Sequence, residues 1–283
     1  MKAYLDLVDK ILVTDTRHED RTGVGTRRIF GETIKFNFDD GFPAVTTKKL
    51  AWKSVVSELL WFLRGSTNVN ELRAILYGEE NRFNTDKKTI WDANFDAQGV
   101  ALGYTGGELG PVYGHQWRNF NSQDFDQIKN LLDEATNTPN SRRLLVSAWN
   151  PVQVKSMALP PCHYGFQVNI RGDYLDLLWS QRSVDVFLGL PFNIASYGLL
   201  LAIFARIVGK KPGNLVGQLG DCHIYTNHID QMNIQSKREP NKRPTLQINP
   251  DLVTLADFEK ASVDDFVLID YKHHETLTGQ MAV

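Results

Sequence analysis

The chain has 283 residues, of which 42% are hydrophobic and 23% are charged. This composition is typical of soluble globular proteins and allows a sizeable core. A formal net charge of -2 is unfavourable for broad nucleic-acid binding, which needs a basic face. No apolar run reaches the roughly 18 residues that a membrane span requires, so we expect no membrane association.

The first residues carry an early acid and no apolar segment, which is unlike a signal peptide. Without an export signal, the two cysteines, Cys162 and Cys222, are expected to be reduced thiols in the cytoplasm. No repeat and no linker rich in proline, glycine or serine divides the chain. We therefore expect one domain covering residues 1–283.

Residues 52–64 have the apolar spacing of a helix, and Gly65 is expected to end it. A second short helix follows from Val69 to Leu76, where Asn68 and Glu71 suggest a capping box. The polar, turn-rich segment 78–88 is predicted to be a loop.

A buried strand is predicted over residues 144–149. Apolar residues alternate over 166–170 and 175–179 on either side of the turn 171–173, which predicts a β-hairpin. Residues 194–208 are apolar almost all round, as in a buried central helix, and 245–248 form another strand. Because helices and strands do not alternate regularly, we predict an α+β fold with a mixed or mostly antiparallel sheet around that helix.

The run Pro160-Pro161-Cys162-His163 precedes the hairpin, and Arg182 follows its second strand. A lone cysteine is more often a buried apolar residue than a nucleophile. Here the rigid Pro-Pro step and the expected return of Arg182 favour a reactive thiol, because a nearby positive charge lowers the thiol pKa. The sequence lacks CxxC pairs and a His-x-x-x-His near a cysteine, so no metal site is expected.

Several polar residues have both an ordinary and a functional interpretation. Adjacent Arg142 and Arg143 fit a solvated strand edge or phosphate capture, and Arg21 in a glycine-containing turn is a third phosphate candidate. Asn193 is either an N-cap of the apolar helix or a reader of a pyrimidine edge. Asp185 is either a salt-bridge partner or a ligand for an N–H-rich heterocycle.

His223 and Tyr225 would share one face of a strand, where they are either half-buried polar rings or ligands for sugar hydroxyls. Glu58 lies close to the inner face of the first predicted helix. A carboxylate there is either paired or catalytic, because burying it alone is costly.

Nearly the whole chain resembles the thymidylate synthase family. The resemblance is carried by ordered motifs: Asp20-Arg21-Thr22-Gly23, Phe42-Pro43, Thr46-Thr47-Lys48, residues 58–63, 110–114, Ser141-Arg142-Arg143, Pro160–His163, 181–197 and 220–225. It implies the family fold and reductive methylation of dUMP to dTMP. The co-substrate 5,10-methylenetetrahydrofolate would give the carbon and the hydride, leaving dihydrofolate, and Cys162 thiolate would add to uracil C6.

The resemblance also implies site residues. It assigns catalytic roles to Cys162, Glu58, Tyr113, Arg182, Asp185, His163 and Asn193. The dUMP site would comprise Arg21, Arg142, Arg143, Arg182, Ser183, Asp185, Asn193, His223 and Tyr225. The folate site would comprise Lys48, Ile90, Trp91, Leu159, Asp185, Gly189, Phe192, Ala282 and Val283. Arg142 and Arg143 would reach the phosphate held by a second subunit, which implies a homodimer.

Two other functions remain open at this point. A dUMP hydroxymethylase would form the same adduct but would trap the C5 methylene with water instead of hydride. Trp91 and the C-terminal Met-Ala-Val favour exclusion of water, and Asn193 disfavours a cytosine substrate. A folate- or RNA-binding protein without catalysis is the second alternative, but no basic, aromatic-interleaved surface indicates nucleic-acid binding.

Overall fold

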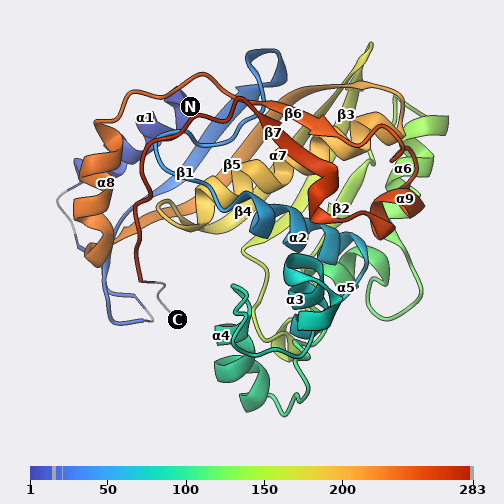
Figure 1. Ribbon diagram of the computed structural model, residues 1–283, viewed down its shortest axis with the longest axis horizontal. Coiled ribbons are helices and arrows are strands. Elements are labelled where there is room, and N and C mark those ends of the chain that lie inside the picture. The colour runs from blue at the N-terminus through green and yellow to red at the C-terminus, as the bar shows by residue number, and fades with distance from the viewer. Residues whose placement is uncertain (15–16, 21, 281–283) are drawn as a thin grey trace.

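A computed structural model describes residues 1–14, 17–20 and 22–280 and shows an α+β fold (Figure 1). In chain order the helices are α1 (Lys2–Leu12), α2 (Trp52–Leu63), α3 (Val69–Tyr77), α4 (Asp92–Asn94), α5 (Tyr113–Arg118), α6 (Gln127–Asn137), α7 (Gly189–Ile207), α8 (Ile229–Ser236) and α9 (Leu255–Lys260). The strands are β1 (Thr26–Asn37), β2 (Leu145–Ser147), β3 (His163–Arg171), β4 (Tyr174–Asp185), β5 (Lys211–Tyr225), β6 (Thr245–Ile248) and β7 (Phe266–Ile269).

Five strands form one sheet in the order β1-β5-β4-β3-β2, and β6 pairs with β7 separately. Neighbours in the large sheet are antiparallel except β4 and β5, which are parallel. The crossover between these two strands is made by α7, which contacts both of them. The predicted mixed, mostly antiparallel sheet and the β3–β4 hairpin are therefore confirmed.

Helix α7 is the predicted central helix, and it begins five residues earlier than expected, at Gly189 rather than Ile194. Asp185 Oδ1 accepts the N–H groups of Phe187 and Leu188, which satisfies donors just before the helix. Pro191 lies in the first turn, where a missing N–H costs nothing. Asn193 is thus inside the helix, and the N-cap interpretation of this residue is wrong.

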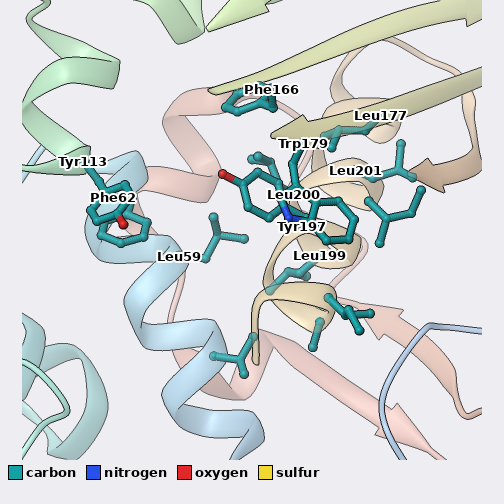
Figure 2. Packing of buried hydrophobic residues seen from close by; sticks show 14 of the residues in the cluster. Leu59, Phe62, Tyr113, Phe166, Leu177, Trp179, Tyr197, Leu199, Leu200 and Leu201 are labelled. Atoms are coloured by element: carbon teal, nitrogen blue, oxygen red, sulfur yellow. The ribbon is translucent and has the colours of Figure 1, made fainter. Parts of the chain in front are cut away.

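By length and composition alone, α7 is also apolar enough to cross a membrane, but 83% of its apolar window is buried inside the protein. It packs against α2 in the core shown in Figure 2. Trp179 from β4 stacks on Tyr197 from α7 at 5.4 Å between ring centroids, and Phe62 from α2 lies 4.9 Å from Tyr113. This aromatic layer forms the floor beneath the hairpin end that carries Cys162.

One local prediction holds and two differ from the structure in detail. Helix α2 ends as predicted before Gly65, whose φ is 71°. Asn68 does cap α3, but its side chain accepts the N–H of Asn70, so no capping box with Glu71 forms. The segment 78–88 is a loop that contains one 3-10 turn at Glu79–Asn81.

The strand predicted over residues 144–149 is shorter, because its ladder is interrupted after Ser147. The N–H groups of Ala148 and Trp149 both donate to the carbonyl of Tyr164, at 2.8 and 3.2 Å. The pairing of β3 with β4 also shifts between His163 and Gly165. These two irregularities lie beside Cys162 and bend the backbone at the end of the hairpin.

Candidate active site

The backbone of Cys162 is fixed on both sides. Its carbonyl accepts the N–H of Arg182 at 2.8 Å, and its own N–H donates to Tyr113 Oη at 2.8 Å. The hairpin therefore returns Arg182 to Cys162, as predicted. The Arg182 guanidinium donates to the carbonyls of Pro160 and Pro161 at 3.0 and 2.9 Å, so it folds back over the Pro-Pro step.

The electrostatics of Cys162 correct one expectation. Burial raises the pKa of the Cys162 thiol, Arg182 opposes this effect, and Asp185 adds to it, so that the pKa lies above its ordinary value. Arg182 thus has the expected sign but does not by itself yield a thiolate. Cys222 is fully buried on β5, and burial raises its pKa to about 12. Both cysteines are free thiols.

Glu58 is a buried carboxyl held by one neutral donor. Trp91 Nε1 donates to Glu58 Oε1 at 2.7 Å, and burial raises the pKa of Glu58 to about 7. Together with Ile90, it lines a cavity of about 210 Å³ between α2 and the segment before α4. A carboxyl that titrates near neutrality and faces a cavity can take up or release a proton there.

His163 is buried and neutral. Its Nδ1 is paired with Tyr197 Oη at 2.9 Å, and its ring stacks on Tyr113 with 4.3 Å between centroids. Burial lowers the pKa of His163 to about 3, so at neutral pH it can only share hydrogen bonds as a neutral ring. The stacking also fixes Tyr113, whose hydroxyl meets the backbone of Cys162.

The amide of Asn193 is oriented by a residue that sequence reasoning did not single out. Gln181, buried on β4, donates through Nε2 to Asn193 Oδ1 at 3.0 Å and to the carbonyl of Ser183 at 3.0 Å. Holding the oxygen in this way directs the NH₂ group of Asn193 away from Gln181. An oriented NH₂ donor favours a carbonyl ligand over an amino group.

Asp185 and Lys48 both form hydrogen bonds with the backbone of Phe187. Asp185 Oδ1 accepts the N–H groups of Phe187 at 2.9 Å and Leu188 at 3.0 Å, so within the described part of the chain it binds backbone amides and not Arg182. Lys48 Nζ donates to the carbonyl of Phe187 at 2.5 Å and lies 3.8 Å from the centroid of its ring. Burial lowers the pKa of Lys48 to about 8. A Cβ on Gly189 would lie 3.6 Å from Asp185 Cβ, an ordinary van der Waals distance, so Gly189 is a neighbour of Asp185.

His223 and Tyr225 share one strand face as predicted, with 5.1 Å between their ring centroids. His223 Nδ1 pairs with Asp221 Oδ1 at 3.0 Å, and this hydrogen bond, more than the nearby Arg28, holds the pKa of Asp221 below its usual range. In the sheet register, His223 lies opposite Asp185. The sugar candidates therefore adjoin the residues around Phe187.

The phosphate candidates are only partly brought together. Ser183 is half-buried near the end of β4, whereas Arg142 and Arg143 are exposed just before edge strand β2. Arg21 lies outside the described residues, as do Ala282 and Val283 of the folate prediction. The remaining folate candidates, Leu159 and Phe192, are half-buried.

Arg73 is another functional candidate that the sequence did not reveal. It is 2% exposed, and its guanidinium donates to the carbonyls of Arg82 and Lys87 and to Asp92 Oδ1 at 2.5 Å. Asp92 directly follows Trp91, so Arg73 holds in place the loop that brings Trp91 to Glu58. The signal would have been an arginine on the apolar face of α3.

A larger cavity of about 1150 Å³ lies elsewhere, between α2, α3, α9 and residues 271–273. Cys162, Glu58 and Asn193 are absent from its described lining. The chemistry-bearing groups therefore gather at the end of the hairpin and not in this cavity.

Comparisons with known proteins agree with the geometry. The profile of the family described as thymidylate synthase matches residues 2–283. A probable thymidylate synthase of Escherichia phage T5 is 49% identical over 285 residues, and the thymidylate synthase of Enterobacteria phage T4 is 48% identical over 292 residues; both alignments cover 100% of each chain. The crystal structure of thymidylate synthase from T4 phage superposes with a TM-score of 0.93 at 47% identity, covering 100% of both chains.

A profile match over nearly the whole chain, full-length relatives near one-half identity and a solved structure of the same fold all name one family. This chain therefore belongs to the thymidylate synthase family and is an enzyme of that family.

Proposed function

We propose that the protein converts dUMP to dTMP, with 5,10-methylenetetrahydrofolate as the donor of one carbon and a hydride. The observation that carries this proposal is a backbone clamp and an arginine at Cys162, together with an oriented amide held by the residue that precedes this arginine. The clamp is the pair of hydrogen bonds to Arg182 and Tyr113, and the amide is that of Asn193, held by Gln181.

In the proposed reaction, Cys162 Sγ adds to C6 of the uracil ring, and C5 becomes the carbon nucleophile. The Asn193 NH₂ group, held by Gln181, donates to uracil O4 and stabilises the charge that develops there. Arg182 and the dUMP phosphate lie on the solvent-exposed side of Cys162. There the positive charge of the guanidinium opposes the rise in the thiol pKa that burial causes. C5 then bonds to the one-carbon unit of the folate and loses its proton. The bond from that carbon to the folate nitrogen breaks, and the hydride of the folate adds to the carbon. As the C5=C6 double bond re-forms, Cys162 leaves C6 as the thiolate.

Glu58 and Tyr113 are proposed to manage the protons. With a pKa near 7, Glu58 exchanges protons through water with the O4 side of the ring. Tyr113, whose hydroxyl contacts the backbone of Cys162, assists loss of the C5 proton. Neutral His163 keeps Tyr113 in place by stacking.

The residues around Phe187 fit a folate. Asp185 is a hydrogen-bond acceptor for the N–H groups of a pterin, and Gly189, which has no side chain, lies next to it. Ile90, 44% exposed, and Trp91, 4% exposed, offer an apolar surface next to Glu58. The folate supplies the carbon unit and the hydride, and Lys48, Leu159 and Phe192 complete the proposed contacts, with Ala282 and Val283 at the end of the chain.

The proposed dUMP contacts divide into ring, sugar and phosphate. His223 and Tyr225 hold the sugar hydroxyl, and Asn193 reads the ring. The phosphate binds Arg182 and Ser183, together with Arg21, and it receives Arg142 and Arg143 from a second subunit.

A homodimer is proposed because this arginine pair is exposed and precedes the edge strand β2, which β3 separates from Ser183 on β4. Exposed apolar side chains also occur on the sheet: Phe30 on β1 is 85% exposed and Leu145 on β2 is 56% exposed. Gly31, with φ at 84°, changes the phase of burial along β1 and turns Phe30 outward. Exposed apolar residues of this kind are typical of association surfaces.

Two further parts of the proposal concern the whole chain. Buried hydrophobic residues from Met1 to Phe266 form one continuous cluster, which supports a single domain over residues 1–283. The free thiols of Cys162 and Cys222 support action in the reducing cytoplasm.

The test is a product assay with dUMP and 5,10-methylenetetrahydrofolate. Formation of dTMP and dihydrofolate in equal amounts is expected. Formation of tetrahydrofolate and 5-hydroxymethyl-dUMP would instead show that water, not hydride, completes the reaction, and would overturn the proposal.

A further inference from the structure

The Arg182 guanidinium lies over the ring of Trp149. The distance from Arg182 Cζ to the ring centroid is 5.6 Å, which is within the range at which a cation is attracted to an aromatic face. Trp149 lies just past the end of β2, and Arg182 lies on β4, so that β3 separates the two strands in the sheet. The contact therefore crosses the end of β3, where Cys162 directly precedes the first residue of the strand.

Two hydrogen bonds hold the same guanidinium. Its Nε and Nη2 donate to the carbonyls of Pro161 and Pro160 at 2.9 and 3.0 Å. These bonds use the N–H groups, whereas the Trp149 ring attracts the charge itself. Arg182 is exposed, so its charge stays beside Cys162 only because these contacts restrain a long side chain.

The backbone before Trp149 is anchored by Gln127, the first residue of α6. Gln127 Nε2 donates to the carbonyl of Ser147 at 2.7 Å, and Gln127 Oε1 accepts the N–H of Ser147 at 3.0 Å. The N–H of Trp149 itself donates to the carbonyl of Tyr164 at 3.2 Å. The amide of Gln127 thus binds Ser147 as a neighbouring strand would, and it fixes the place where β2 ends.

The backbone after Trp149 is anchored by Asn150, which is 3% exposed. Its Nδ2 lies 3.1 to 3.2 Å from the side-chain oxygens of Gln116, Asn121 and Gln153. Gln116 belongs to α5, and α5 and α6 pack against β2 and against each other on the right of Figure 1. Trp149 is therefore held between two buried amides, and its ring is a fixed support for another side chain.

The charge of Arg182 bears directly on the Cys162 thiol. Burial raises the pKa of this thiol, Arg182 lowers it, and Asp185 at the end of β4 raises it further. Tyr113 and His163 also face Cys162, but burial raises the pKa of Tyr113 and lowers that of His163, so both are neutral near pH 7. Of these four neighbours, Arg182 is the one that stabilises the thiolate.

We propose that Trp149 is a positioning residue that keeps the Arg182 guanidinium beside Cys162 and thereby sets how readily the thiol reacts. This part of the inference concerns the protein alone. Its consequence for the turnover of dUMP rests on the proposed function.

Alkylation of Cys162 by iodoacetamide, followed as a function of pH without substrates, tests the placement of Arg182. Trp149→Leu keeps an apolar side chain but removes the aromatic face. It should slow alkylation about threefold near pH 7.5, which corresponds to a shift of the pH profile by about half a unit to higher pH. Trp149→Phe, which keeps an aromatic face, should recover most of the lost rate.

The shape of the profile separates a charge effect from a change in access to the thiol. The difference between Trp149→Leu and wild type should shrink as rising pH ionises the thiol in both proteins. Slowing by the same factor at every pH would overturn the proposal, because it would mean that the reagent reaches Cys162 less easily. An unchanged profile in Trp149→Leu would overturn it as well.

Two further variants make the test specific. Tyr174→Leu is the matched control, because Arg171 lies 5.2 Å from the Tyr174 ring at the other end of the same hairpin. It should leave the profile unchanged, and a shift equal to that of Trp149→Leu would contradict the proposal. In an Arg182→Ala background, Trp149→Leu should slow alkylation no further. Equal slowing with and without Arg182 would show that Trp149 does not act through this arginine.

The consequence for catalysis appears in the pH dependence of kcat/KM for dUMP. In Trp149→Leu this profile should move by the same half unit or so, while KM for 5,10-methylenetetrahydrofolate stays within about twofold. A shifted alkylation profile with an unshifted kcat/KM profile would refute the role in turnover. Normal alkylation in a variant that still forms dTMP would instead refute the placement of Arg182 by Trp149 and leave the proposed function standing.

Discussion

Glu58, His163 and Tyr113 are each 9% exposed or less, whereas Arg142, Arg143 and Arg182 are exposed. The buried group is held by protein partners at hydrogen-bond distance: Trp91, Tyr197 and the backbone of Cys162. By contrast, Arg142 and Arg143 lie before an edge strand.

The two groups of side chains are therefore held in place in different ways. The groups proposed to move protons are preorganised inside one chain, and burial raises the pKa of Glu58 to about 7, close to the pH at which it would exchange protons. The groups proposed to bind phosphate are long, exposed side chains whose positions are completed by the ligand and by a second subunit. Cys162 lies between the buried groups and the exposed groups. Burial raises the pKa of its thiol, and Arg182 opposes that rise.

The largest effect is expected at Cys162. Cys162→Ser should lower turnover by about a thousandfold or more, because a hydroxyl is a far weaker nucleophile than a thiolate. Binding of dUMP, followed by calorimetry, should change little. Cys222→Ala is the matched control, since this cysteine is buried and outside the site. Near-normal turnover of Cys162→Ser would remove the thiol from the mechanism.

In the buried half, Glu58 should make stability depend on pH. Its pKa rises from 4.5 in the unfolded chain to about 7 in the folded one. The folded state therefore holds the proton longer, and stability is lost as pH rises between these values. Relative to Glu58→Gln, wild type should lose about 2 to 3 kcal/mol of unfolding free energy between pH 5 and pH 8 in urea titrations. Parallel curves for the two proteins would contradict the buried, shifted carboxyl.

In the exposed half, Arg143→Ala should weaken dUMP binding by about ten- to a hundredfold, the strength of a charge-assisted contact to phosphate. The loss should shrink for deoxyuridine, which has no phosphate. Arg171→Ala offers a control, because Arg171 is also exposed but pairs with Asp176 at the far end of the hairpin. An equal loss for dUMP and deoxyuridine would argue against a phosphate contact.

A smaller effect is expected from the residue that orients Asn193. Gln181→Leu should reduce discrimination between dUMP and dCMP by about tenfold, because the amide could then turn its oxygen toward an amino group. Steady-state kinetics with both nucleotides would measure this ratio. Ser180→Ala, next to Gln181 but bonded to Gln218, should leave it unchanged. A preserved ratio in Gln181→Leu would mean that Asn193 is oriented by something else.

Much of this arrangement could be predicted because it is local in sequence. The hairpin around residues 171–173 and the turn chemistry of Gly65 follow from alternation and backbone preference. The apolar run after Asn193 predicted a buried helix but not its start, because the donors before the helix are satisfied by Asp185 rather than by an N-cap side chain.

Residues that act through long-range contacts were not predictable. Gln181 and Tyr197 lie within the family motif 181–197 but were assigned no role, and Arg73 lies in none of the motifs. Each gains its role from a partner 12 to 34 positions away or from a loop that it holds. The raised pKa of the Cys162 thiol could not be predicted either. Burial raises this pKa and Arg182 lowers it, and the sequence shows only the arginine.

Mixing two inactive variants tests most directly whether the buried groups around Cys162 of one chain work with Arg142 and Arg143 of another. In dimers re-formed from equal amounts of Cys162→Ser and a double Arg142→Ala, Arg143→Ala variant, half should be mixed, and each mixed dimer should contain one intact site. About one-quarter of wild-type turnover should be recovered after the two variants are refolded together. Turnover no higher than that of the separate parents would contradict a site shared between two subunits.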